Sequence, residues 1–122
     1  MIFFGIGTDI VEVERIEKSI NRTEKFLEKV FTKREVDYCN SKPNRYERYA
    51  GRFCAKEAVS KALGTGVRNF KLTDMEILND ELGKPIIYFN GQLENLEKEY
   101  EIHLSISHCK DYATATAIIF KK

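Results

Sequence analysis

The stretch NRYERYAGRFCAKEAVSKALGTG, residues 44–66, decides the fold because it contains one long helical pattern. Tyr46, Ala50 and Phe53 repeat at spacings of three and four residues, which predicts a helix with one apolar stripe. The pattern begins near residue 44 and ends near residue 63, where Gly64 supplies the C-terminal stop. We expect the rest of the chain to fold against this helix.

Strands are predicted both before and after the long helix in the sequence. Residues 2–13 alternate as a buried strand, with Ile2, Phe4, Ile6, Thr8 and Ile10 on one face and Phe3, Gly5, Gly7, Asp9 and Val11 on the other. Further strands are predicted over residues 73–79, 85–89, 101–108 and 112–120, with a turn at residues 82–84 between the first two.

Shorter helices complete the pattern. One helical stretch runs from about residue 12 to residue 30 in two pieces, and another covers about residues 91–99. Thr32 and Glu35 form a capping-box pattern that starts a short helix ending near Pro43. The sequence therefore predicts one α+β domain over residues 1–122, with an antiparallel sheet packed against one long helix and several short helices.

The composition excludes several classes of protein. The chain has 122 residues, of which 43% are hydrophobic and 32% charged, as in an ordinary globular domain. No apolar run approaches the roughly 20 residues of a membrane span, and a net charge of +1 does not suggest nucleic-acid binding. The cysteines, odd in number at 3, fit neither a disulfide framework nor a zinc site, so we expect free thiols in the cytoplasm.

Two carboxylates stand at apolar positions. Asp9 interrupts the first strand, and Gly5 and Gly7 on its face are expected to leave room for a ligand. Glu57 falls within about 40° of the apolar stripe of the long helix. Together they would form a hard oxygen site that suits Mg²⁺. The alternatives are an edge-strand Asp9 that caps a nearby turn and an ordinary surface pair between Glu57 and Lys61.

Two further segments are candidates for binding or catalysis. Gly64 and Gly66 flank a threonine after the long helix and allow close approach of backbone amides to an anion, with Lys61 as a phosphate partner; a simple C-cap turn is the alternative. His108 ends the strand HLSISH and could act as a general base at neutral pH, or it could be a structural histidine. A serine nucleophile has no GxSxG motif to support it.

A basic stripe runs along the helical stretch after the first strand, formed by Arg15, Lys18, Arg22, Lys25 and Lys29. Glutamates recur beside it, so a solvated face of mixed charge is the default interpretation unless an acidic partner exists.

Four blocks of sequence resemble the holo-acyl-carrier-protein synthase family of phosphopantetheinyl transferases. They are GIGTDIVEVERI, AGRFCAKEAVSKALGTG, GKP and HLSISH, in the family's order between Gly5 and Ile119. A minor departure is Cys54, where a small residue such as alanine is usual. The resemblance implies a phosphopantetheinyl-transferase-like fold, and an enzyme of fatty acid biosynthesis that moves phosphopantetheine from coenzyme A to a serine of apo-acyl carrier protein with Mg²⁺.

The resemblance also implies roles for particular residues. Asp9 and Glu57 would be the magnesium ligands and Lys61 a phosphate contact. Positions near coenzyme A and the reacting groups would be Arg52, Gly64, Gly66 and His108. Acyl carrier protein would dock on Arg15, Arg22 and Lys25. The family's small members are homotrimers whose sites lie between neighbouring subunits.

Some alternatives stay open at this point. The proton acceptor for the carrier serine could be His108, Glu57 or a metal-bound water. The client could instead be a polyketide or peptide synthase carrier, although that broader group often has two fused halves and about twice this length. A module that only binds coenzyme A or carrier protein would not need Asp9, Glu57 and Lys61 together.

Overall fold

The computed structural model describes residues 1–64 and 69–122. The strands are β1 (Ile2–Glu12), β2 (Met75–Asn79), β3 (Pro85–Phe89), β4 (Tyr100–His108) and β5 (Tyr112–Lys121). The helices are α1 (Val13–Arg22), α2 (Glu24–Val30), α3 (Lys33–Asn40), α4 (Arg45–Leu63) and α5 (Leu96–Glu99), with 3₁₀ turns η1 (Leu72–Asp74) and η2 (Gly91–Leu93). The α+β class is confirmed, and these elements lie within a few residues of their predicted bounds.

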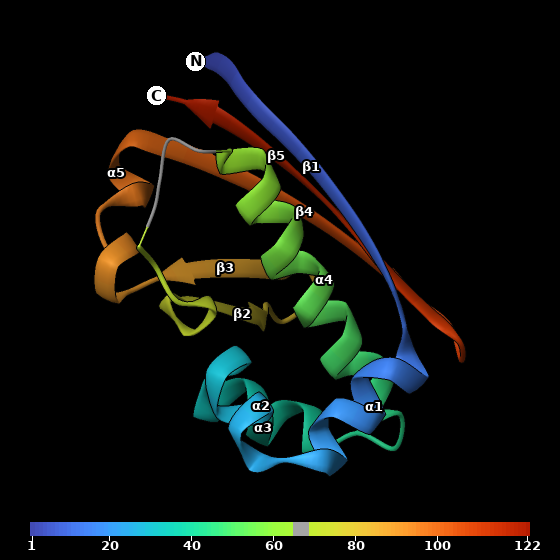
Figure 1. The fold of residues 1–122 in the computed structure, drawn as a ribbon. Helices are drawn as coiled ribbons and strands as arrows, with labels where there is room; N and C mark the ends of the chain where they lie inside the picture. The colour runs from blue at the N-terminus through green and yellow to red at the C-terminus, as the bar shows by residue number, and fades with distance from the viewer. Residues whose placement is uncertain (65–68) are drawn as a thin grey trace.

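The strands of the described residues form two antiparallel sheets rather than one. β1, β5 and β4 pair in that order, while β2 and β3 form a separate hairpin. Figure 1 shows α4 lying across one face of the larger sheet, with α1, α2 and α3 gathered near the N-terminal end of α4. The two termini lie side by side because Ile2 pairs with Lys121.

Small residues let α4 approach the sheet closely. Ala115 and Ala117 of β5 are buried beneath the helix, next to Asp9 and Gly7 of β1. A Cβ atom placed at Gly7 would overlap the carbonyl oxygen of Ala58 and lie 2.8 Å from the backbone nitrogen of Ala62. Gly5 likewise faces the backbone of Ala62. The prediction that these glycines leave room for a ligand is therefore wrong, because α4 fills that space.

The first strand is buried on one face only, which corrects the prediction of a buried strand. Its alternation is as predicted, but the face with the isoleucines points away from α4. Ile2, Ile6 and Ile10 are 72%, 60% and 67% exposed. Within the described residues, no helix covers this outer face of the sheet (Figure 1).

Caps at the helix ends match the sequence signals. Thr32 and Glu35 form the predicted capping box at the start of α3. Gly64 follows α4 with a φ of 66°, a left-handed conformation that glycine adopts at little cost.

Candidate active site

Asp9, Glu57 and Lys61 meet where α4 crosses β1. The Lys61 ammonium donates to Oδ1 of Asp9 at 3.1 Å and to the carbonyl oxygen of Thr8 at 2.9 Å. Lys61 thus binds Asp9 across the two elements, and the described residues contain no ion pair between Lys61 and Glu57. Burial raises the pKa of the Glu57 carboxyl, the negative charge of Asp9 raises it further, and Lys61 lowers it.

The two carboxylates fit a hard divalent cation. They line a cavity of about 210 Å³ together with Arg15, Phe26 and Phe53. Desolvation and mutual repulsion disfavour two negative charges here, and a cation between them would relieve both effects. Residues 1–64 and 69–122 contain no group of three or more His, Cys, Asp or Glu side chains that could hold a metal. Mg²⁺ commonly binds through one or two carboxylates plus phosphate oxygens, so this pair is sufficient for that mode.

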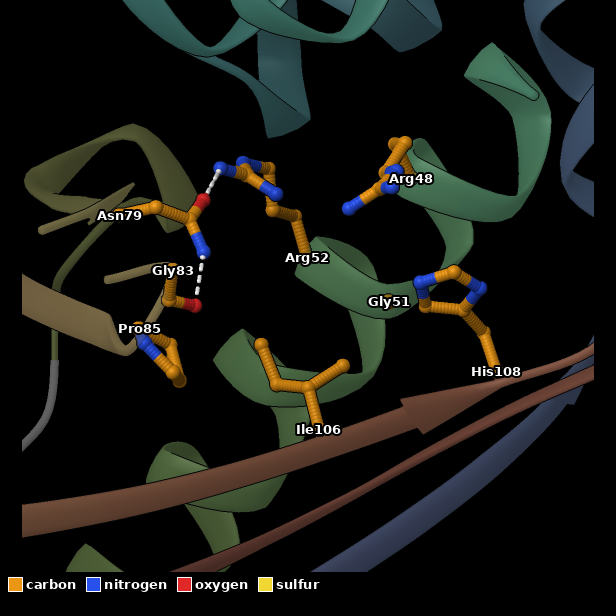
Figure 2. A pocket seen from close by; sticks show the side chains of 8 residues that line it. All are labelled: Arg48, Gly51, Arg52, Asn79, Gly83, Pro85, Ile106 and His108. Atoms are coloured by element: carbon orange, nitrogen blue, oxygen red, sulfur yellow. Dashed lines mark hydrogen bonds between the residues drawn. The ribbon is translucent and has the colours of Figure 1, made fainter. Parts of the chain in front are cut away.

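A second cavity, of about 170 Å³, lies on the other side of α4. Figure 2 shows the side chains that line it, which are Arg48, Gly51, Arg52, Asn79, Gly83, Pro85, Ile106 and His108. They come from α4, from the β2–β3 hairpin and from the end of β4. Two guanidinium groups and an imidazole in one hollow form a site for an anion, because guanidinium groups bind phosphate in paired hydrogen bonds.

Arg52 is held rigidly in this cavity. Its guanidinium lies 4.3 Å from the ring centre of Tyr38, and its Nη2 donates to Oδ1 of Asn79 at 2.6 Å. The Asn79 amide in turn donates to the carbonyl oxygen of Gly83 at 2.8 Å. Among the described residues, Nε of Arg52 is the buried side-chain atom that lacks a hydrogen-bond partner. An unpaired buried N–H is costly, so Arg52 retains a donor for a ligand.

His108 is oriented by a carboxylate. Its Nδ1 lies 2.8 Å from Oε1 of Glu47, which is one helical turn before Gly51 on α4. With Nδ1 engaged, Nε2 is the ring atom that can meet a ligand in the cavity.

The structure brings the predicted site residues together as two separate groups. Asp9, Glu57 and Lys61 lie on the β1 side of α4, whereas Arg52 and His108 lie on the β4 side. Arg52 and Glu57 are five residues apart, so they point about 140° apart around the helix. β1 and β4 are opposite edges of the sheet, with β5 between them. The two groups of a single copy therefore face opposite edges of the larger sheet.

The structure describes only one of the two glycines that were predicted to bind a ligand. Gly64 ends α4 as predicted, but Gly66 lies outside the described residues. Sequence reasoning missed Arg48, Asn79 and Glu47 as site residues. Arg48 had a usable signal, since it precedes Arg52 by one helical turn, whereas Asn79 and Glu47 reach the site only through the tertiary fold.

The basic residues near α1 are arranged around the carboxylate cavity. Arg15 lines that cavity and also a neighbouring groove with Lys18 and Arg22. Lys18 pairs with Glu14 on its own helix at 3.2 Å, while Arg15 and Arg22 form no ion pair within the described residues. Lys25 lies in the first turn of α2. The arginines are thus available to an acidic partner.

Comparison with known proteins gives the family. Residues 5–117 match the model of the 4'-phosphopantetheinyl transferase superfamily. The chain belongs to this superfamily, and the enzyme class follows from it. More particularly, it is similar to the holo-[acyl-carrier-protein] synthase of Fusobacterium nucleatum, with 52% identity over 97% of this chain and 99% of that one.

Solved structures agree in fold. A holo-(acyl-carrier-protein) synthase from Bacillus anthracis, solved in complex with CoA (3',5'-ADP), is 38% identical with a TM-score of 0.82, covering 100% of this chain and 99% of that chain. The synthase from Helicobacter pylori in complex with coenzyme A is 32% identical with a TM-score of 0.81, covering 94% of this chain and 99% of that chain. The family predicted from the four sequence blocks is confirmed. In the described part of the chain, no helix is long and apolar enough to cross a membrane.

Proposed function

We propose that the chain transfers phosphopantetheine from coenzyme A to a serine of apo-acyl carrier protein in fatty acid biosynthesis, with Mg²⁺ held by Asp9 and Glu57. The transferase activity follows from the family. One observation supports these residue roles: Asp9 and Glu57 line the same cavity, and Lys61 binds Asp9 beside it, where α4 crosses β1. A protein that only binds coenzyme A has no need of two carboxylates forced together in this way.

The carboxylates and the lysine would bind the pyrophosphate of coenzyme A in different ways. Bound by Asp9 and Glu57, Mg²⁺ would supply neutralisation of the charge on the phosphate oxygens. Lys61 is more than half exposed and ends in a single flexible ammonium, so it can turn from Asp9 toward a phosphate. The carrier serine would give its hydroxyl proton to His108, to Glu57 or to water as it attacks the phosphorus next to pantetheine, and the bond between that phosphorus and adenosine bisphosphate would break.

The cavity with Arg48, Arg52 and His108 would receive the phosphate-bearing nucleotide end of coenzyme A. The unpaired Nε of Arg52 is a donor that suits phosphate oxygens. Nε2 of His108 adds a second donor when the ring is protonated, because Nδ1 already donates its proton to Glu47. Gly64, at the C-terminal end of α4, would lie beside the path of the ligand, and the role in coenzyme A binding proposed for Gly66 rests on the sequence alone. The cavity has a volume of about 170 Å³, which is below the 300–1,000 Å³ usual for ligand pockets. A volume this small is expected if the cavity is only half of a site.

Two copies would therefore build one site. Because the carboxylate group and the arginine group lie on opposite sides of α4, coenzyme A would contact the first group of one copy and the second of its neighbour. His108 would reach the reacting phosphates only from that neighbour. The uncovered outer face of the sheet, with Ile6 and Ile10, supplies apolar surface for self-association. We propose a homotrimer with a site at each interface.

The acidic carrier would dock beside the carboxylate cavity. Arg15 and Arg22 line the groove of α1, Lys25 follows in the first turn of α2, and Arg15 also lines the cavity where the serine must arrive. The reaction would take place in the cytoplasm, where the cysteines at positions 39, 54 and 109 would stay as the free thiols seen here.

Intact-mass analysis tests the function. Apo-acyl carrier protein incubated with the enzyme, coenzyme A and Mg²⁺ should gain the mass of one phosphopantetheinyl group, and EDTA should prevent this reversibly. Apo-carriers from polyketide and peptide synthases, run in parallel, should be modified more slowly. An unchanged carrier mass with every substrate would leave only a binding module.

A further inference from the structure

A lysine and a glutamate are fully buried on the side of α4 that faces the β2–β3 hairpin. Lys56 and Glu35 are each 0% exposed, and Nζ of Lys56 lies 2.6 Å from Oε1 of Glu35. Burial lowers the pKa of Lys56, and Glu35 acts in the opposite direction. Removing two charges from water costs about as much as their attraction returns, so such a pair is a poor source of stability. We therefore attribute the presence of the buried pair to the conformation that it fixes and not to any gain in stability.

The hydrogen bonds of the pair join four elements of the chain, namely α2, α3, α4 and β2. Lys56 also donates to the carbonyl oxygen of Val30 at 2.6 Å, at the end of α2. Oε1 of Glu35 accepts the backbone N–H of Thr32 at 2.9 Å, and Oε2 accepts the backbone N–H of Ile77 at 2.8 Å. The Glu35 carboxylate therefore ties α3, α4 and β2 to one point.

A second attachment of β2 lies two residues further along the strand. Arg52, one helical turn before Lys56, donates to Asn79 at 2.6 Å. Asn79 is thus bonded directly to α4, and Ile77 is bonded to Glu35 of α3, which Lys56 ties to α4. The hairpin forms no backbone ladder with the larger sheet among the described residues, so side-chain bonds and apolar packing determine where it sits. Besides the bonds at Ile77 and Asn79, Glu76 of β2 accepts from the Thr32 hydroxyl at 2.6 Å and pairs with Arg34 of α3 at 3.4 Å, but its side chain is not among those that line the cavity. Apolar packing alone tolerates sliding, whereas a hydrogen bond requires a defined distance and angle.

We propose that the buried Glu35–Lys56 pair is a positioning device for the coenzyme A cavity. By fixing Ile77, it holds the hairpin where Asn79, Gly83 and Pro85 face Arg52 and complete the wall of the cavity (Figure 2). Neither Glu35 nor Lys56 touches the cavity, so both act through the hairpin. The inference rests on the proposed function of that cavity.

The test is Lys56→Met, which keeps the length of the side chain but leaves Glu35 without its counter-charge. Coenzyme A binding to the full-length protein is measured by calorimetry with Mg²⁺ and without carrier. We expect the Kd to rise about tenfold or more, because small misplacements of positioning groups are costly. The KM for coenzyme A should rise in parallel, while kcat at saturating coenzyme A and the KM for carrier stay within about twofold.

Ile119→Ala is the matched control. Ile119 is fully buried in β5, in the larger sheet, and its truncation should lower the melting temperature without changing the Kd for coenzyme A. If Lys56→Met loses stability but binds coenzyme A as the wild type does, the pair is merely structural and the proposal is overturned.

If Lys56→Met does not fold, the double variant Glu35→Gln with Lys56→Met decides. Replacing both charges by neutral groups of similar shape is often tolerated. A glutamine at position 35 can accept through one atom only, so it cannot hold both Thr32 and Ile77. The folded double variant should still bind coenzyme A weakly, and wild-type affinity would overturn the proposal. A wild-type protein that fails to bind coenzyme A at all would overturn the cavity assignment, and this inference with it.

Discussion

Gly7→Ala should separate α4 from β1 and so weaken both the fold and the carboxylate site. The new methyl group would overlap the carbonyl oxygen of Ala58 and lie 2.8 Å from the nitrogen of Ala62, while real Cβ atoms essentially never come within 3.0 Å of another atom. Both neighbours are backbone atoms of α4, so neither can turn away. The helix must move by on the order of 1 Å, which also moves Glu57 away from Asp9.

The structure sets the expected size of the effect. Overpacking a core typically costs 1–3 kcal/mol, and backbone neighbours place Gly7→Ala at about 3 kcal/mol. For a chain of this length that corresponds to a melting temperature lower by about 12 °C. Differential scanning calorimetry at fixed protein concentration measures it, since association makes the melting temperature concentration-dependent. Below the melting temperature, the folded variant should need more Mg²⁺ for half-maximal transfer.

Gly51→Ala is the control because it makes the same substitution within α4. The nearest atom to a Cβ there is a side-chain methyl of Ile106 at 3.0 Å, which can shift, and alanine favours the helix by up to about 1 kcal/mol. Its melting temperature should stay within about 4 °C of the wild type. A Gly7→Ala protein as stable as Gly51→Ala, with an unchanged Mg²⁺ requirement, would refute the close packing of α4 on β1.

Three further predictions concern the charged and nucleophilic groups. Glu57→Gln should abolish transfer and yet raise the melting temperature of the metal-free protein at pH 7; because the folded-state pKa of Glu57 is raised, this gain should fade as the pH falls toward the ordinary glutamate range, and Mg²⁺ should no longer stabilise the variant. N-Ethylmaleimide at pH 8 should label the exposed Cys109 alone, since burial raises the pKa of the other two thiols to about 12; mass mapping that finds all three labelled in the folded protein would contradict their burial. Arg22→Glu combined with Lys25→Glu, two positions outside the carboxylate cavity, should raise the KM for carrier protein strongly and leave the KM for coenzyme A near wild type, with added salt acting in the same direction; an unchanged carrier KM would place docking elsewhere.

Local signals predicted the elements and part of the site. Three features could be predicted without the structure because each depends on residues close in sequence. They are the capping box at Thr32, the helix end at Gly64 and the alternation of the strands. Asp9 and Glu57 were visible as carboxylates at apolar positions, and the structure does bring them to one cavity.

Contacts distant in sequence were not predictable in the same way. Gly7 was interpreted as leaving room for a ligand, because nothing in a single strand reveals the helix that packs on it. Glu35 was recognised as a helix cap, but its bond to Lys56 joins residues 21 positions apart. Asn79 reaches Arg52 from a separate hairpin. Helix periodicity places Arg52 and Glu57 on different sides of α4, but which strand lies beside each of them follows from the strand order, which periodicity does not determine.

A subunit-mixing experiment tests the central claim that one site is built from two copies. Glu57→Gln chains, which lack the carboxylate group, are dissociated and reassembled in equal amounts with chains carrying Arg48→Glu and His108→Ala, which lack the nucleotide cavity. Each pure variant should be inactive. In a random mixture, about a quarter of the interfaces combine an intact carboxylate group with an intact cavity, so about a quarter of wild-type activity should return. A mixture as inactive as its parents would contradict the shared site.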